Sequence, residues 1–192
     1  MPRAEPIGFA RLPGGARVTV RTACPGEAGR IQDYVRSLSP SSRYDRFLAP
    51  LNELSPAELA RIGAGDERQA TLVAETRIAG VRTVIGEARY AIASGRTTCE
   101  IAVSVADAWR WRGVGMLLMQ YLECRTRGLG VTTLVGDVLR SNAAMRTLAR
   151  KAGFDTGVPA DARLVRIVKD ISASRIGVPC ARVMTTGLSM AA

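Results

Sequence analysis

Residues 105–116, Val-Ala-Asp-Ala-Trp-Arg-Trp-Arg-Gly-Val-Gly-Met, decide the fold of this chain. They follow an alternating apolar run and precede apolar residues at helical spacing, so they join a buried strand to the N-terminus of an amphipathic helix. The first N–H groups of a helix lack intrahelical partners and lie at the positive end of its dipole. Gly113 and Gly115 leave room for an oxyanion to reach those groups, and Arg110 and Arg112 add positive charge. The stretch therefore predicts a diphosphate cradle.

Two common phosphate-binding motifs do not fit this stretch. The dinucleotide fingerprint needs a third glycine three residues after Gly115, where the chain has Leu118. A P-loop needs a Gly-Lys-Ser/Thr sequence, which the chain does not contain. On the glycines alone, an ordinary strand–helix turn with exposed arginines is an alternative of equal weight.

The rest of the chain shows two periodicities. Alternating or continuous apolar runs predict strands, and apolar residues at i, i+3, i+4 and i+7 predict helices. The predicted strands cover residues 16–21, 70–78, 81–93, 97–105, 131–139 and 164–171. The predicted helices lie around residues 31–38, in two short segments that each begin at Ser-Pro between 39 and 65, from 114 to the glycine at 128, and from 141 to 152.

The order of these elements predicts an α/β (α+β) fold. Tight turns join the three strands between residues 70 and 105, which is typical of an antiparallel meander. The strand–helix–strand–helix–strand order that follows implies a sheet with parallel neighbours in its middle. We expect residues 1–15 to be an extended leader, 16–171 to be a single domain, and 172–192 to be a C-terminal tail.

Composition and charge limit the classes of function. The chain has 192 residues, of which 47% are hydrophobic and 23% charged, as expected for one globular domain. Its formal net charge is +10, and all but two of its 27 basic residues are arginines. This excess suits a phosphate-rich ligand. Because the arginines are scattered rather than clustered, we do not expect a nucleic-acid partner.

The absence of histidine excludes several catalytic and metal sites. Ser-His-Asp and Cys-His nucleophiles and HExxH metal sites all require it. The four cysteines, Cys24, Cys99, Cys124 and Cys180, contain no CxxC pair, and they predict free thiols and no metal site. Free thiols, the lack of a signal-peptide core and the lack of an 18-residue apolar run together predict a cytoplasmic protein without a membrane span.

Several segments carry a resemblance to a known family. Residues 110–115, Arg-Trp-Arg-Gly-Val-Gly, fit the Q/R-x-x-G-x-G/A signature of the GNAT (Gcn5-related N-acetyltransferase) superfamily. Asn142 to Met145 and Leu148 to Phe154 resemble its second signature, an Asn before Lys-x-Gly-Phe. Residues 37–62 and 99–107 resemble the GNAT domain of bacterial Pat-type protein lysine acetyltransferases.

The resemblance covers about residues 14–171 and implies both fold and function. The implied fold is a mixed, mostly antiparallel sheet of six or seven strands, with helices on both faces and a V-shaped split between two central strands. The implied reaction is direct transfer of an acetyl group from acetyl-CoA to a primary amine, with a protein lysine preferred. A small-molecule amine acetyltransferase and a non-catalytic acyl-CoA-binding regulatory module are the alternatives. The sequence makes no prediction of oligomeric state.

The same resemblance implies roles for particular residues. It implies that the acetyl-CoA diphosphate binds at Arg110, Arg112, Gly113, Val114, Gly115 and Met116, that the backbone of Ile101, Val103 and Val105 pairs with the pantetheine arm, and that Asn142 and Met145 line the far side of that arm. No metal is implied.

Glu100 is the predicted catalytic residue. An alkyl ammonium has a pKa of about 10.4, so it must lose a proton before it can act as a nucleophile. A carboxylate that reaches the amine directly or through one water can accept that proton. Glu100 matches the glutamate position of Pat-type enzymes, although a solvated glutamate paired with an arginine is the structural alternative. An amide N–H of Ile101 or Val103 could stabilise the oxyanion. Ala149 stands where many family members carry a tyrosine, so no general acid is assigned.

For several further residues the sequence leaves a functional and a structural role open. Asp107 and Asp137 could orient arginines or a substrate amine, or act as ordinary caps. The side chains of Trp109 and Trp111 could cover the adenine or pack against the helix. Three residues on the helix after Ser39 could select the substrate or only hold that helix in place: Arg43, Tyr44 and Arg46.

Overall fold

The computed structural model describes residues 6–24, 26–63, 65–93, 95 and 97–173. The strands are β1 (Pro6–Arg11), β2 (Arg17–Thr22), β3 (Gln69–Ile78), β4 (Val81–Ile92), β5 (Thr98–Val105), β6 (Thr133–Leu139), β7 (Asp155–Gly157) and β8 (Leu164–Asp170). The helices are α1 (Ala28–Ser37), α2 (Pro40–Phe47), α3 (Pro56–Gly63), α4 (Val114–Arg127) and α5 (Ala143–Lys151), with a 3-10 turn at Asp107–Trp109. Residues 1–5 of the predicted leader and 174–192 of the predicted tail lie outside the described residues.

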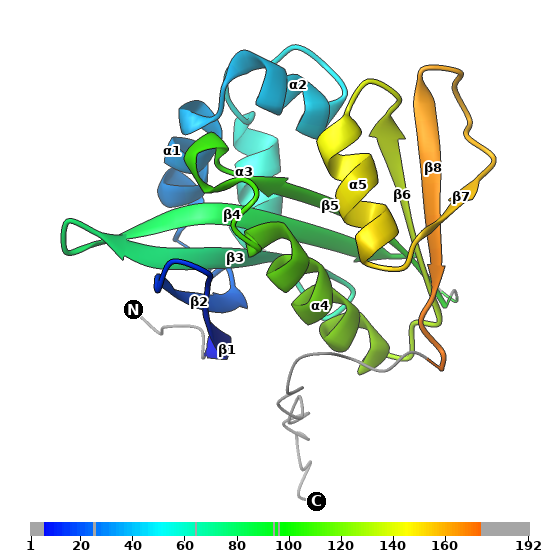
Figure 1. Ribbon diagram of the computed structural model, residues 1–192, viewed down its shortest axis with the longest axis horizontal. Coiled ribbons are helices and arrows are strands. Elements are labelled where there is room, and N and C mark those ends of the chain that lie inside the picture. The colour runs from blue at the N-terminus through cyan, green and yellow to red at the C-terminus, as the bar shows by residue number, and fades with distance from the viewer. Residues whose placement is uncertain (1–5, 25, 64, 94, 96, 174–192) are drawn as a thin grey trace, which may run out of the picture.

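All eight strands belong to one mixed sheet in the order β1-β2-β3-β4-β5-β6-β8-β7 (Figure 1). Neighbouring strands are antiparallel except β5 and β6, which are parallel. The antiparallel meander of β3, β4 and β5 and the parallel pair in the middle of the sheet are therefore as predicted.

The sheet has eight strands among the described residues, whereas the sequence predicted six or seven. β1 forms within the segment expected to be a leader and pairs antiparallel with β2. Gly8 allows this, because a Cβ at this position would lie 1.8 Å from the Tyr121 hydroxyl oxygen. The other addition, β7, has three residues and pairs with β8. Both strands are short or interrupted by glycine and proline, so their periodicity is weak.

A V-shaped split opens between β5 and β6, as expected. Their parallel register covers three residue pairs, from Thr98 with Thr133 to Glu100 with Val135. Beyond Glu100, β5 continues to Val105 beside β4, while β6 continues to Leu139 beside β8. The backbone groups on the facing edges of the two strands are therefore not paired with each other beyond this point.

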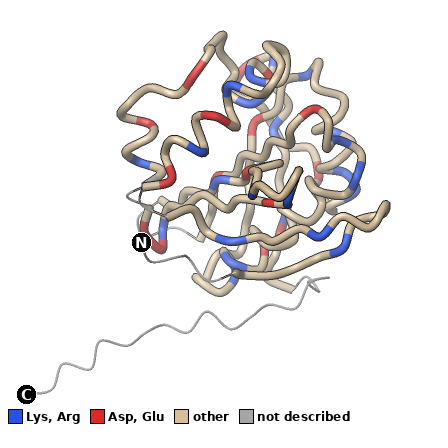
Figure 2. The backbone as a smooth tube through the Cα atoms, turned by 90° about the vertical axis from the view of Figure 1, so that its left-hand side faces the viewer, with Lys and Arg blue, Asp and Glu red and all other residues tan. Residues whose placement is uncertain are grey.

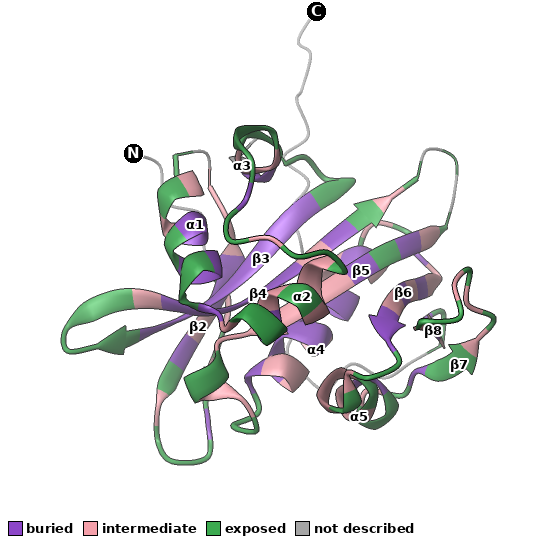
Figure 3. Ribbon diagram, turned by 90° about the horizontal axis from the view of Figure 1, so that it is seen from above, coloured by how far each residue is buried: buried purple, intermediate pink, exposed green. Residues whose placement is uncertain are grey.

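Helices cover both faces of the sheet, and each face has its own core. Leu72 and Val73 are neighbours on β3, so their side chains point to opposite faces. Leu72 belongs to the core that packs under α4, and Val73 belongs to the core under α1 and α3. Figure 3 shows buried residues concentrated on the central strands and exposed residues on the outer surfaces of the helices.

Buried ion pairs fix α1 against the sheet. Arg21 Nε donates to Glu75 Oε2 at 2.9 Å, and Arg21 Nη1 donates to Glu27 Oε2 at 2.5 Å. Arg30 contacts both of these carboxylates. Burial alone raises the pKa of Glu75, but hydrogen bonds and charge from the two arginines outweigh it, so this pKa lies below its ordinary value.

This cluster predicts a loss of stability in acid. A carboxylate whose pKa is lowered on folding stabilises the protein above its unfolded pKa, about 4.3, and loses that contribution as the pH falls through the folded value. We expect the melting temperature to fall between about pH 5 and pH 3. Glu75→Gln should lower the melting temperature at pH 7 and flatten the acid decline, measured by scanning calorimetry. Glu53→Gln, which breaks the exposed Glu53–Arg36 pair, is the control. Equal curves for the two variants would contradict this account.

The described cysteines differ in state. Cys124, on α4, is disulfide-bonded, so the expectation of four free thiols is wrong at this position. Cys180 lies outside the described residues. Burial raises the pKa of the Cys99 thiol to about 12, which makes it a poor nucleophile at neutral pH.

Figure 2 shows the Lys and Arg positions distributed over many elements of the fold rather than along one stripe. Among the described residues, no helix is both long enough and apolar enough to cross a membrane.

Candidate active site

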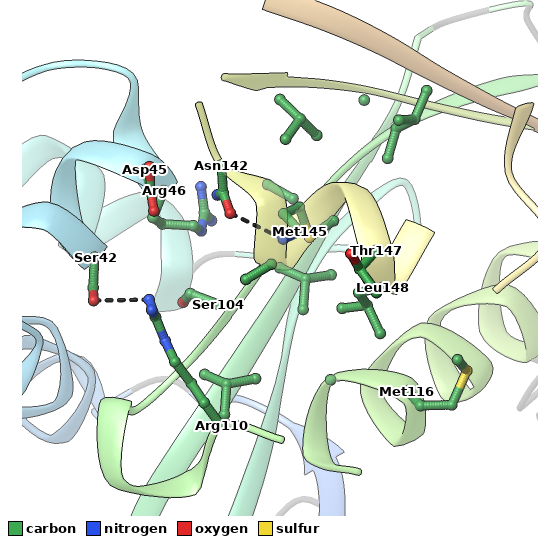
Figure 4. Close-up of a pocket in the computed structure, with 18 of the residues that line it drawn as sticks. Ser42, Asp45, Arg46, Ser104, Arg110, Met116, Asn142, Met145, Thr147 and Leu148 are labelled. Carbon is green, nitrogen blue, oxygen red and sulfur yellow. Dashed lines mark hydrogen bonds between the residues drawn. The ribbon is translucent and has the colours of Figure 1, made fainter. Parts of the chain in front are cut away.

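A cavity of about 350 Å³ lies at the split in the sheet. Its walls come from β5, from the loop that leads into α4, from β6 and α5 on the opposite side, and from α2 (Figure 4). The split creates this space because the two strands that form its walls diverge after Glu100.

Most of the predicted site residues line this cavity. Those that do are Ile101, Val103, Val105, Arg110, Gly113, Gly115, Met116, Asn142 and Met145. Three do not: Glu100, Arg112 and Val114. Val114 is buried in the core beneath α4. Arg112 is exposed, and its guanidinium lies 5.2 Å from the centre of a Trp109 ring.

The N-terminus of α4 opens at the cavity without a side-chain cap. Gly113 is the N-cap residue, and its φ of 91° lies in the left-handed region that favours glycine. Among the described residues, no side chain accepts a hydrogen bond as a cap from the first N–H groups of this helix, so these groups can bind an anion. Gly115 has a second role. A Cβ there would lie 2.8 Å from Leu148 Cδ2, so this glycine also lets α5 approach α4.

Gly113→Ala should affect both folding and donor binding. The left-handed conformation costs an L-residue with a side chain about 1–2 kcal/mol, so we expect the free energy of unfolding to fall by that amount. The same turn aims the helix N–H groups at the cavity, where the resemblance to GNAT enzymes implies an acetyl-CoA diphosphate. We therefore also expect weaker binding of CoA, measured by calorimetry. Gly29→Ala is the matched control, since Gly29 lies in α1 without positive φ and a Cβ there meets no neighbouring atom. Equal CoA affinity in the two variants would contradict the prediction.

Arg110 links the α4 loop to α2. Its Nη2 donates to Ser42 Oγ at 2.8 Å, and its Nε lies 3.5 Å from Asp107 Oδ1. Asp107 in turn accepts hydrogen bonds from the Ser39 N–H at 2.9 Å and from Ser42 Oγ at 2.5 Å. The Asp107 carboxylate therefore fixes the N-terminus of α2 against the loop, and Arg110 extends toward α2 within the cavity wall (Figure 4).

The two faces of β5 contribute different chemistry to the cavity. Ile101, Val103 and Val105 pack toward the core under α4. Ala102 and Ser104 point to the other face, where the Ser104 hydroxyl lies 2.9 Å from the Tyr34 hydroxyl of α1. Because side chains of both faces line the same cavity, the cavity passes through the sheet at the split.

The wall from α2 is polar, and Arg46 is its one residue that the sequence predicted. Ser42, Asp45 and Arg46 line the cavity from this helix. Among the described residues, Asp45 has neither a side-chain hydrogen bond nor an ion pair. Burial raises the pKa of Asp45 above its ordinary value, while nearby Arg110 acts in the opposite direction. No motif marks Ser42 or Asp45, because their position depends on how α2 packs beside β5.

Arg46 forms an ion pair with the buried carboxylate of Glu87. Arg46 Nε donates to Glu87 Oε1 at 3.0 Å, and Arg89 Nε donates to Glu87 Oε2 at 2.9 Å. Glu87 lies on β4 and its side chain is 0% exposed. Burial raises the pKa of Glu87, but the charges of the two arginines outweigh it and hold this pKa below its ordinary value. Two cations thus share one buried anion at the edge of the cavity.

Arg43 and Tyr44, which the sequence also offers for substrate selection, do not line the cavity as Arg46 does. Arg43 donates to the backbone carbonyls of Leu51 and Leu38, so it holds the chain on either side of α2. Tyr44 is 38% exposed and does not line the cavity. Trp109 lines the cavity and packs against the core, whereas Trp111 lines it with 77% of its surface exposed.

Glu100 lies at the vertex of the split, in the last residue pair that joins β5 to β6. Its side chain is exposed and shares a face with Ala102 and Ser104.

The Asp137 carboxylate lies further along β6, where Oδ1 accepts from Arg166 Nε at 2.9 Å. Asp137 lines the cavity but is committed to this pair, whereas no hydrogen bond to the Glu100 carboxylate occurs within the described residues.

The α5 wall is mainly apolar. Asn142 is the N-cap of α5, and its Oδ1 accepts from the Met145 N–H at 2.9 Å. Met145 and Leu148 then face the cavity from the first turns of the helix (Figure 4). Ala149 is buried, and no tyrosine or cysteine of the described chain lines the cavity.

This arrangement can bind an extended ligand across the sheet. An uncapped helix N-terminus suits a diphosphate, an unpaired strand edge suits an amide-containing arm, and polar side chains lie on the opposite face. Residues 33–154 of the chain match the Acetyltransferase (GNAT) family. The chain belongs to this family. As a GNAT acetyltransferase it is an acyltransferase that carries out acetyl-CoA-dependent N-acetyl transfer.

Individual relatives agree with this assignment. Acetyltransferase PA5475 from Pseudomonas aeruginosa is 31% identical over 144 residues, which cover 74% of this chain and 77% of that protein. The GNAT domain of S. lividans PAT has a TM-score of 0.78 at 26% identity, covering 85% of this chain and 96% of that domain. The fold is also similar to yncA from Salmonella typhimurium, solved with its cofactor acetyl-CoA, with a TM-score of 0.64 at 20% identity over 85% of this chain and 99% of that one.

Proposed function

We propose that this GNAT acetyltransferase transfers the acetyl group of acetyl-CoA to the side-chain amine of a lysine in a protein substrate. The observation that supports this most is the cavity through the split, with an uncapped helix N-terminus on one side and polar side chains on the other. The choice of lysine rests on the resemblance of residues 37–62 and 99–107 to Pat-type protein lysine acetyltransferases.

The proposed donor site follows the cavity from α4 to the vertex of the split. The N–H groups of Val114, Gly115 and Met116 would bind the diphosphate, with positive charge from Arg110. The backbone of residues 101–105 would pair with the pantetheine arm as an added strand does. Asn142 and Met145 would contact the arm from the α5 side. Bound acetyl-CoA supplies an activated thioester.

Glu100 is the proposed general base. Because its carboxylate is exposed and lies next to the cavity rather than in its lining, we propose that it acts through one water. It would take a proton from the lysine ammonium, and the freed amine would attack the thioester carbonyl. The C–N bond forms, the C–S bond breaks, and the extra proton on the attacking nitrogen passes through water to the leaving thiolate, so the products are an N-acetyl-lysine and CoA thiol. An N–H group of Ile101 or Val103 would stabilise the oxyanion.

A thiol-release screen tests the proposed function. Purified protein is given acetyl-CoA with lysine-containing proteins and peptides, with acyl-CoA synthetases as one protein group, and with small amines and polyamines. The proposal expects free CoA thiol and acetyl-lysine with at least one protein acceptor. Activity on small amines alone would remove the lysine assignment. Thermal stabilisation by acetyl-CoA without turnover on any acceptor would indicate a non-catalytic binding module.

Two broader expectations stay predictions. One is that residues 16–171 form a single domain, and the other is a cytoplasmic location. The disulfide at Cys124 removes the free-thiol argument for that location.

A further inference from the structure

The Arg46–Glu87–Arg89 cluster has more positive than negative charge. Two guanidinium groups contact the one carboxylate of Glu87, each through Nε. The Arg46 side chain is only 9% exposed, and that of Glu87 is 0% exposed. No other ion pair to either arginine occurs within the described residues. The cluster therefore carries two positive charges and one negative charge, and its Arg46 and Glu87 side chains are largely removed from water.

Hydrogen-bond donors in the same cluster lack acceptors. Arg46 Nη2 and Arg89 Nη2 are both buried without a hydrogen-bond partner in the described chain. The two guanidinium groups lie 4.9 and 5.8 Å from the centre of the Phe47 ring, which supplies no acceptor atom for a conventional hydrogen bond. Buried charged donors are almost always paired, so two orphaned donors at one place point to an anionic partner.

The position of Arg46 limits what this partner can be. Arg46 points from α2 into the cavity (Figure 4). It shares a face of the sheet with Ser104, because Arg46 Nε and Ser104 Oγ lie 3.0 and 3.5 Å from the same Glu87 Oε1. The N-terminus of α4, where the proposed donor diphosphate binds, belongs to a helix that packs in the core on one face of the sheet, whereas Phe47 of α2 packs against the core on the other face. An anion beside Arg46 would therefore belong to the acceptor.

We propose that Arg46, which lines the cavity, binds a carboxylate of the acceptor substrate. The planar guanidinium of Arg46 has an Nη2 without a hydrogen-bond partner in the described chain, and arginine binds carboxylates through parallel N–H donors. The enzyme thus selects amines that carry a carboxylate close by. In a protein substrate this group is an aspartate or glutamate beside the acceptor lysine, and in a free amino acid it is the molecule's own carboxylate. The inference rests on the proposed function, because it assigns the acceptor half of the same cavity.

Matched acceptor pairs test this subsite. The first pair consists of two capped peptides in which the lysine is flanked by either aspartate or asparagine. The second pair consists of a free amino acid and its amide. Wild-type protein is expected to favour the carboxylate member of one pair by about 10- to 100-fold in kcat/KM, since a hydrogen-bonded charge contributes on this scale. The pair that responds identifies the source of the carboxylate. Equal use within both pairs would overturn the proposal, whether or not any variant folds.

Variants show whether Arg46 causes the preference. Arg46→Gln should lower kcat/KM for the carboxylate member to the level of its neutral partner, and Arg46→Lys should retain part of the preference. Arg36→Gln is the matched control, because it removes one arginine charge from the exposed pair with Glu53, away from the cavity. A preference that survives Arg46→Gln, or an equal loss for both members of a pair, would contradict the assignment.

A binding measurement separates this inference from the proposed activity. Peptides that already carry acetyl-lysine cannot react, so their affinity for the protein saturated with CoA can be measured by fluorescence anisotropy without turnover. The aspartate peptide should bind at least about 10-fold more tightly than the asparagine peptide, and Arg46→Gln should abolish the difference. This result without any thiol release would keep the subsite and remove the proposed function. Equal affinities for the aspartate and asparagine peptides, together with thiol release, would remove the subsite and keep the proposed function.

Discussion

Glu100→Gln is expected to lower kcat at saturating amine by about 10²- to 10⁴-fold, the range that general-base catalysis contributes. The reason is that the amide cannot accept the proton of the acceptor ammonium. Glu100 lies at the vertex of the split, whereas the proposed diphosphate cradle lies at the N-terminus of α4. Affinity for acetyl-CoA should therefore stay within about twofold of the wild-type value. Thiol-release kinetics at several acetyl-CoA concentrations would measure both quantities.

The pH dependence of this loss distinguishes a base from a structural residue. At higher pH a larger fraction of the amine is already deprotonated, because its pKa is about 10.4. The difference between wild type and Glu100→Gln should narrow as the pH rises from 7 toward that value. If Glu100→Gln lowers kcat by the same factor at every pH from 7 upward, Glu100 does not act as the base.

Asp45→Asn is the matched control for Glu100→Gln. Asp45 also lies at the acceptor end of the cavity, and burial raises the pKa of its carboxyl, so it is the rival carboxylate. We expect Asp45→Asn to change kcat less than Glu100→Gln does, because Asp45 is on α2 and not beside the strand edge that would hold the thioester. A larger loss in Asp45→Asn would transfer the assignment to that residue.

Glu87→Ala is expected to destabilise the fold by about 3–5 kcal/mol, the usual cost of removing one partner from a buried ion pair. The substitution leaves the Arg46 and Arg89 guanidiniums near each other with no anion between them. For a domain of this size the melting temperature should fall by about 6–20 °C. Scanning calorimetry at neutral pH would measure the change.

An exposed pair supplies the comparison for this prediction. Glu53→Ala removes a carboxylate from the Arg36–Glu53 pair, in which both side chains are more than half exposed. Exposed pairs contribute about 0–1 kcal/mol, so this variant should melt close to the wild type. Similar melting temperatures for Glu87→Ala and Glu53→Ala would show that Glu87 is not the buried counterion described above.

The sequence predicted the parts of the fold that depend on local pattern. Residues 105–116 combine a strand end, two glycines and a helix start, and each of these signals acts over a few residues. The apolar spacing around Leu118 and Tyr121 predicted α4, and the turn near Gly80 predicted the β3–β4 hairpin. Periodicity of this kind is strong in long elements, because many side chains must then face the same core.

Features that depend on distant pairing could not be predicted. Arg46 and Glu87 are 41 positions apart, and nothing near either residue indicates that α2 places one over the other. β1 forms because its Gly8 fits against Tyr121, a contact across more than 100 residues. The resemblance placed Arg112 at the donor site, whereas the structure places its side chain over Trp109. Local propensity does not encode such contacts, which depend on the packed fold.

We propose that the N-terminus of α4, with glycine as its N-cap, binds the diphosphate of acetyl-CoA. A crystal structure of the protein with CoA would test this binding mode. We expect the diphosphate at the N–H groups of residues 114–116 and the thiol at the split between β5 and β6. A diphosphate bound elsewhere on the protein, with the α4 N-terminus facing only solvent, would contradict it.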